Sequence, residues 1–275
     1  MEEENITKVF IQFCKEGNLI KAQQILLKNP NINNSDKFKL AFRYACEKGH
    51  LEVAQWLLQV KPDIHISADN EIVFYYACVN GHLEVAQWLL QVKPDINISD
   101  TNNCVFLNAC VKGHLKVVQW LFRVNPDIDI SDDIDEAFRC ACEKGHLEVV
   151  KWLFQVNPNI HISADNDYAF RFACWYGHLE VAKWLLQLKR DIIISADNDK
   201  CAFRGACETG RLEVAKWLLQ VKPDIDISVD NDYAFHLACK RGHLEVAKWL
   251  LQVKPDIVIS GDDDYAFRNA CNINT

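Results

Sequence analysis

Glycine is scarce in this sequence outside one recurring position. Eight of the ten glycines mark the same turn of a repeated unit, and only Gly205 and Gly261 lie elsewhere. This distribution leaves no glycine-rich loop that could cradle a phosphate, and the signatures of serine hydrolases and zinc proteases are missing too. We therefore expect a protein that is not an enzyme and binds no cofactor.

Basic charge and long apolar runs are lacking as well. The formal net charge is −8 at pH 7, which argues against duplex nucleic acid as a partner because phosphate binding needs a basic surface. No apolar run approaches the roughly 20 residues of a membrane-spanning helix, and the opening stretch MEEENITKVFIQFCKEGN has no apolar core of a secretory signal. We expect a soluble protein of the cytoplasm, where the 12 cysteines stay reduced.

Repetition is what the sequence has in abundance. A glycine recurs every 32 residues, with one interval of 33, at Gly17, Gly49, Gly81, Gly113, Gly145, Gly177, Gly210 and Gly242. Seven of the eight tryptophans follow this glycine by seven residues, all seven prolines follow it by thirteen, and nine of the 12 cysteines precede it or its equivalent by three. A unit of this size cannot bury its own apolar surface, so successive copies must stack and share one core.

The spacing predicts an all-α solenoid that runs as a single domain over residues 1–275. Each repeat is expected to be a helix-turn-helix unit, with short extended fingers between repeats and a half-repeat at the end. The eight repeats and the half-repeat are expected at approximately 3–34, 35–66, 67–98, 99–130, 131–162, 163–194, 195–227, 228–259 and 260–275.

Each repeat should contain a short first helix and a longer second helix. In the second helix, as in 50–60 (HLEVAQWLLQV), three polar residues form one narrow stripe and apolar residues cover the rest. Gly-His opens this helix and Lys-Pro closes it. The first helix is expected at roughly 166–175, with Asp165 and Asn166 as N-cap residues. The tryptophan, midway along the second helix, is predicted to belong to the core.

The run A-C-x-x-G-H-L-E-V-A-K-W-L-L closely resembles the A-A-x-x-G-H-x-E-I-V-K-L-L-L of the ankyrin repeat, and the following P-D-I-x matches its G-A-D-V-N segment. The resemblance covers eight units and a half, and it implies an ankyrin-type solenoid. Two features depart from the family: residues 168–171 (YAFR) replace the T-P-L-H turn, and the finger lacks its glycine. The tryptophan-rich repeat sequence looks like that of ankyrin arrays encoded by giant DNA viruses of amoebae. This resemblance would place the protein in the host cell cytoplasm.

The recurrent Cys-x-x-Gly-His, as in Cys46–His50, has the residue types of a zinc site but too few ligands for one. Structural zinc takes four ligands, whereas each repeat offers two and the next pair is one stacked helix away, at about 8–10 Å. The Asp-Asn-Asp clusters at 165–167, 197–199 and 230–232 lack the glycine turn and terminal glutamate of a calcium-binding loop. We predict no bound metal, an inert buried cysteine, and a histidine that bonds backbone between helices.

Copies of a repeat within one chain show which positions are free to vary. The two residues before the glycine vary most, and Trp175-Tyr176 stands there in place of residues that are mostly charged or small in other copies. In the ankyrin family, residues just before Gly-His line the concave groove where partners bind, so the resemblance places this aromatic pair near the middle of the groove. The alternatives are sequence drift at a loop, or packing of the pair against Cys207-Glu208 of the next repeat. The predicted partner-binding residues are Trp175, Tyr176, Arg139, Arg171, Arg204, Tyr75, His236, Lys240 and Arg241.

These observations predict a monomeric scaffold that binds a protein partner of unknown identity and performs no chemistry. One alternative is a substrate adaptor of a ubiquitin ligase. An adaptor would need an added module that recruits the ligase, whereas in this sequence the repeats run to both ends. Another is a metal or redox protein that uses the repeated cysteine and histidine, and stoichiometric bound metal would favour it.

Overall fold

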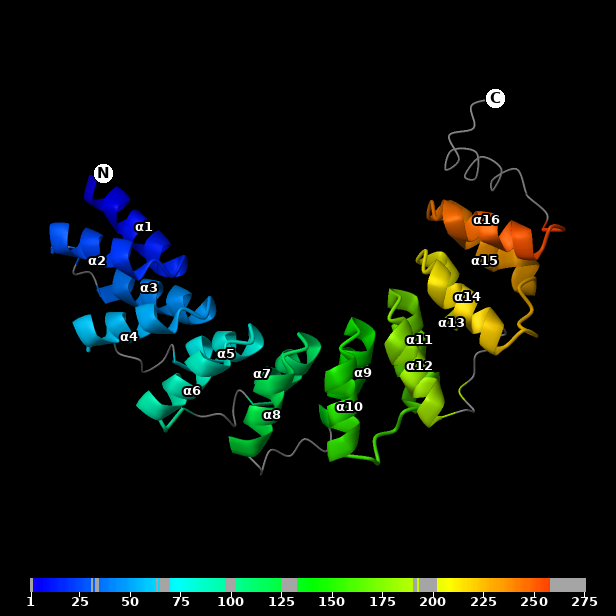
Figure 1. Ribbon diagram of the computed structural model, residues 1–275, viewed down its shortest axis with the longest axis horizontal. Coiled ribbons are helices and arrows are strands. Elements are labelled where there is room, and N and C mark those ends of the chain that lie inside the picture. Colours follow the sequence, from blue (N-terminus) through cyan, green and yellow to red (C-terminus); the bar gives the residue numbers. More distant parts are fainter. Residues whose placement is uncertain are drawn as a thin grey trace. The chain divides into compact units, whose positions relative to one another are not determined.

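The computed structural model describes residues 2–30, 32, 35–62, 64, 70–96, 102–124, 133–189, 192 and 202–257. These residues form sixteen helices and contain no strand (Figure 1). Contacts divide the chain into an N-terminal unit, Met1–Asp133, and a C-terminal unit, Ile134–Thr275. The predicted half-repeat at 260–275 lies outside the described residues, and the single continuous domain stays a prediction.

The N-terminal unit consists of helix pairs. Its helices are α1 (Glu2–Lys15), α2 (Leu19–Lys28), α3 (Ser35–Glu47), α4 (Leu51–Val60), α5 (Asn70–Val79), α6 (Leu83–Val92), α7 (Asn102–Val111) and α8 (Leu115–Val124). The odd-numbered helices pack on one another in chain order, and each even-numbered helix packs beside the helix before it (Figure 1).

The C-terminal unit repeats this arrangement. Its helices are α9 (Asp133–Lys144), α10 (Leu147–Val156), α11 (Ala164–Tyr176), α12 (Leu179–Leu188), α13 (Ala202–Glu208), α14 (Leu212–Val221), α15 (Val229–Lys240) and α16 (Leu244–Val253). Here α11 packs on α13 and α13 on α15, each with its second helix beside it. The predicted all-α class of helix-turn-helix repeats is confirmed.

The turn inside each repeat explains why its glycine is constant. All eight glycines have a positive φ, from +73° at Gly17 to +89° at Gly177. The backbone N–H of Gly49 donates to Cys46 O at 3.1 Å, and that of His50 donates to Ala45 O at 2.8 Å. These are the two bonds of a Schellman motif, which ends a helix with a left-handed residue. A side chain at this position would be strained, and at Gly49 it would also collide with the His82 ring of the next repeat.

The residue after the glycine ties one repeat to the preceding one. The His50 ring packs over the preceding repeat's turn, and its Nε2 is hydrogen-bonded to Lys15 O at 3.1 Å. His178 makes the same type of bond to the backbone of Glu143. The predicted role of the histidine, bonding backbone between helices, is therefore confirmed at these positions.

We expect the fold to lose stability as the pH falls below about 6.5. Burial lowers the pKa of His82 and His178 from the usual 6.5, because a desolvated imidazole resists protonation. Their neutral rings stabilise the fold fully above pH 6.5, and this contribution is lost as the pH drops, since the unfolded chain then binds protons more readily. The urea midpoint should be lower at about pH 5.5 than at about pH 7.5. The double variant His82→Gln, His178→Gln should show a smaller drop; an equal drop would contradict this explanation.

Aromatic rings fill the seams, by which we mean the contacts between successive repeats. A phenylalanine of one first helix lies against the tryptophan of the next repeat's second helix, as for Phe170 and Trp217, whose ring centroids are 6.3 Å apart. Phe170 is fully buried, whereas among the repeat tryptophans only Trp120 is buried and the others are half-buried. The tryptophans are thus less buried than predicted, because an indole that bridges two helices keeps one edge at the surface.

Candidate functional site

Side chains at the ends of the first helices form a row along the C-terminal unit. We define this turn row by the two residues before each repeat glycine together with the one arginine that follows a glycine: Glu143, Lys144, Trp175, Tyr176, Glu208, Thr209, Arg211, Lys240 and Arg241. The stacking of α11 on α13 and of α13 on α15 places its members in order along the unit. Four predicted partner-binding residues belong to it: Trp175, Tyr176, Lys240 and Arg241.

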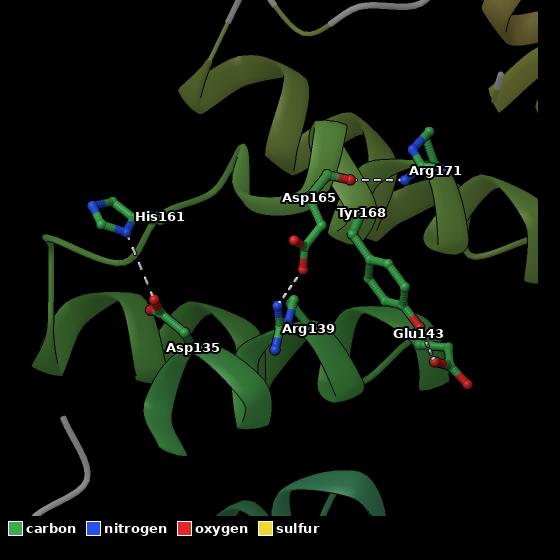
Figure 2. Close-up of polar contacts among 7 residues, drawn as sticks. All are labelled: Asp135, Arg139, Glu143, His161, Asp165, Tyr168 and Arg171. Atoms are coloured by element: carbon green, nitrogen blue, oxygen red, sulfur yellow. Dashed lines mark hydrogen bonds and ion pairs between the residues drawn. The ribbon is translucent and has the colours of Figure 1, made fainter. Parts of the chain in front are cut away.

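Polar side chains join α9 to α11 beside this row. Arg139 Nη1 donates to Asp165 Oδ2 at 2.6 Å, and the Tyr168 hydroxyl donates to Glu143 Oε2 at 3.1 Å (Figure 2). Burial and the Glu143 carboxylate raise the pKa of Tyr168 to about 12, so its hydroxyl keeps the proton that it donates. Arg139, predicted to meet a partner, is 31% exposed and already paired with an aspartate that is 66% exposed. An ion pair this open contributes at most about 1 kcal/mol.

A left-handed turn begins α11. Asp165, Asn166 and Asp167 have φ values of 53°, 58° and 58°, a conformation that costs residues other than glycine about 1–2 kcal/mol each. Arg171 spans the turn: its Nη2 donates to Asp165 O at 2.8 Å (Figure 2), and its Nε donates to Asn166 O at 2.6 Å. The prediction that Asp165 and Asn166 cap the helix is wrong, since the left-handed turn continues through Asp167 and separates both residues from the regular helix that follows. Arg171 stabilises the turn in their place.

Trp175 faces the next repeat. A Cβ on Gly205 of α13 would lie 2.6 Å from Trp175 Cε3, so the indole occupies the space that a side chain at 205 would fill. The Trp175 carbonyl accepts a hydrogen bond from the Thr209 hydroxyl at 2.5 Å. These contacts favour the alternative that Trp175 packs on the next repeat, with Gly205 and Thr209 as its neighbours. The indole is half-buried.

Tyr176 is the exposed tip of an aromatic cluster on α11. The rings of Tyr168 and Phe172 are stacked with centroids 4.0 Å apart, and the Phe172 ring lies 6.2 Å from that of Tyr176. Lys144 Nζ, from α9, lies 5.4 Å from the Tyr176 centroid. Tyr176 is 40% exposed, so part of its ring faces solvent while the rest is held by its neighbours.

Two of the predicted residues lie largely inside the unit. Arg204 is 7% exposed, and its guanidinium lies 5.2 Å from the centroid of the Tyr233 ring. This contact packs α13 against α15, so Arg204 offers little surface to a partner. His236 is half-buried on α15, where its ring is edge-on to Phe235 with centroids 6.0 Å apart.

The remaining predicted residues are more open. Lys240 is exposed, and Arg241, 59% exposed, forms an ion pair with Glu208 at 3.0 Å. Tyr75 belongs to the N-terminal unit, where it is half-buried and its ring is edge-on to that of Tyr76 at 5.3 Å. The structure therefore gathers Lys240 and Arg241 on the turn row and leaves Tyr75 in the other unit.

Three residues that complete the region escape sequence reasoning: Gly205, Thr209 and Arg211. The signal for two of them was present, because Gly205 is one of two glycines outside the repeat turn and Arg211 stands where six repeats have histidine. Arg211 crosses the preceding turn, since a Cβ on Gly177 would lie 2.8 Å from Arg211 Cδ. Nothing in the sequence relates Thr209 to the Trp175 carbonyl.

The repeated cysteines are buried thiols. The eight members in the described residues, from Cys14 to Cys239, are 0–3% exposed. Burial raises the pKa of Cys14 to about 12 and raises the pKa of Cys46 and Cys142 as well. A thiol that keeps its proton is a poor nucleophile and a poor metal ligand. In the described ranges, no three His, Cys, Asp or Glu side chains are grouped so that they could hold a metal ion.

Comparison with protein families assigns this architecture. The family described as ankyrin repeats (3 copies) matches residues 10–100, 106–198 and 172–261, and the chain therefore belongs to the ankyrin-repeat family. A search of curated proteins finds no match. The family is generally non-enzymatic, and its repeats serve as protein–protein interaction scaffolds. Among the described helices, none has the length and apolar character needed to cross a membrane.

Proposed function

We propose that this protein is a non-enzymatic scaffold that binds a protein partner through the turn row and the adjoining surface of α9, α11 and α15. Tyr176, Lys240 and Arg241 would contact the partner directly. Arg139 and Arg171 would hold the surface in shape, because both are engaged with the turn at the start of α11. The setting that we propose is the cytoplasm, and the host cytoplasm if the resemblance to giant-virus arrays extends to the origin of the chain.

Tyr176 is the observation that carries this proposal. The residue is 40% exposed, and its ring is supported by Phe172 below and Lys144 beside it. A rigid, partly exposed aromatic side chain surrounded by polar groups is typical of the residues that dominate binding energy at protein interfaces. Its position before the repeat glycine is also one that the ankyrin family uses for partners.

The test is capture of partners from a lysate of the native cell by the immobilised full chain. We expect Tyr176→Ala to reduce the captured partner by about tenfold, because the exposed ring is lost from the centre of the interface. Thermal unfolding should be nearly unchanged, since the half-buried rings beneath stay in place.

Leu188→Ala is the matched control. Leu188 ends α12, the second helix of the same repeat, and is 41% exposed, against 40% for Tyr176. It should capture as much partner as the wild type. Equal capture by Tyr176→Ala, or an equal loss with Leu188→Ala, would defeat the proposal.

A further inference from the structure

Departures from the repeat gather at one seam. Trp175, Gly205 and Arg211 each differ from the residues at the same position in the other repeats, and they are separated by up to 36 residues in the sequence. At the α11–α13 seam they come together, since Trp175 lies on Gly205 and the Arg211 stem lies over the turn that follows Tyr176. The only 33-residue interval between repeat glycines, from Gly177 to Gly210, spans the same seam.

Arg211 replaces, at this seam, the histidine that follows the glycine in six other repeats. His50 bonds the carbonyl of Lys15, the residue two before the preceding glycine, and His82 and His178 make the same type of bond to Glu47 and Glu143. At this seam the corresponding carbonyl is that of Trp175, and Thr209 Oγ1 lies 2.5 Å from it and 2.8 Å from Gly205 O. Arg211 keeps its stem over the turn, and the residue is exposed. In the described part of the chain, its guanidinium makes no hydrogen bond or ion pair.

The charges that the turn row exposes are positive, although the chain as a whole is acidic. Its two carboxylates are covered: Glu143 is 18% exposed and bonded to Lys144 and Tyr168, and Glu208 is 17% exposed and paired with Arg241. Its four cations reach solvent, and they are Lys144, Arg211, Lys240 and Arg241. Tyr176 lies between the first two in repeat order, with Lys144 from the preceding repeat and Arg211 from the following one.

We propose that the Tyr176 site binds an acidic, extended segment of a partner protein, with carboxylates held by Lys144 and Arg211 and an adjacent apolar side chain packed on the Tyr176 ring. This inference rests on the proposed function and names the class of partner for it. An arginine fork binds a carboxylate through two parallel hydrogen bonds, which a histidine cannot supply. Because the rest of the chain carries excess negative charge, such a segment is attracted mainly to this row.

The test selects ligands without knowing the partner. Random twelve-residue peptides displayed on phage are panned against the full chain, and the clones with the highest enrichment are sequenced. We expect enriched peptides to carry Asp or Glu beside an aliphatic or aromatic residue. Neutral or basic enriched peptides, or no enrichment, would overturn the inference.

The decisive variant is Arg211→His, which restores the residue found in six other repeats and should fold normally. A dye-labelled enriched peptide is titrated by fluorescence anisotropy at low and high salt. Arg211→His and Lys144→Gln should each weaken binding of the acidic peptide by about fivefold to tenfold. A peptide with Gln in place of each Asp and Glu should bind the wild type no more tightly than the acidic peptide binds these variants. Unchanged affinity in Arg211→His would overturn the inference.

Lys248→Gln is the matched control for charge. Lys248 is 49% exposed on α16, where it pairs with Glu245, and its loss should leave peptide binding unchanged.

The scaffold function and the acidic ligand would be contradicted by different results. If Tyr176→Ala abolishes capture while the selected peptides are neutral, the scaffold function stands and the acidic ligand is wrong. If the wild type captures no partner and enriches no peptide, both are wrong.

Discussion

Gly205→Phe is expected to lower the free energy of unfolding by about 2–3 kcal/mol, because its ring must enter space that the Trp175 indole already fills. A Cβ alone would lie 2.6 Å from Trp175 Cε3, and neither α11 nor α13 can withdraw without opening the seam between them. The measurement is urea unfolding of the purified full chain, followed by circular dichroism.

A second substitution, at Trp175, should restore the stability of this variant. Trp175→Glu with Gly205→Phe recreates the residues found at the same two positions one repeat earlier, Glu143 and Phe172. We expect the double variant to recover most of the loss, with a coupling energy of about 2 kcal/mol. Strictly additive effects of the two substitutions would show that indole and glycine are not matched to each other.

Phe170→Ala is expected to lower the free energy of unfolding by about 3–5 kcal/mol, more than Gly205→Phe. Phe170 is fully buried, and its ring lies against Trp217 of the next repeat. Truncation therefore removes a core side chain and one side of a seam together. Because repeats of a solenoid are stabilised by their neighbours, hydrogen exchange should first quicken in the amides of α11 to α14.

Phe172→Ala provides the comparison for that loss. Phe172 is on the same helix, two residues further along, but it is half-buried and contacts other rings of the exposed cluster. Its removal should cost about 1–2 kcal/mol. If both alanine variants unfold at the same urea concentration, the seam contact of Phe170 contributes less than the structure implies.

The helices of this fold are readable from the sequence because their boundaries are set locally. Gly-His and Lys-Pro determine where the second helix starts and stops, and the structure places α4 at Leu51–Val60 as that pattern indicates. The start of α11 is different. Three successive residues other than glycine adopt a left-handed conformation there, held by Arg171 several residues later. No local propensity favours such a turn, so sequence reasoning reads Asp165 and Asn166 as ordinary caps.

The candidate site was predictable only in part, because its character depends on pairs of distant residues. Comparison among repeats points to Trp175 and Tyr176 equally. Only the structure separates them: one packs on Gly205, thirty residues away, and the other is exposed beside Lys144. Arg204 is a similar case, since its position in a variable column gives no sign that it is buried over the Tyr233 ring.

The arginine that replaces histidine at one junction has a consequence for how such an array can evolve. A duplicated repeat inherits the contacts of its parent together with its residues, so a histidine that joins two repeats is hard to replace. Here Arg211 keeps the packing of that histidine over the preceding turn, and its guanidinium makes no hydrogen bond or ion pair in the part of the chain that the structure describes. Junctions of this kind let one copy diverge toward a new ligand while its siblings keep the array intact.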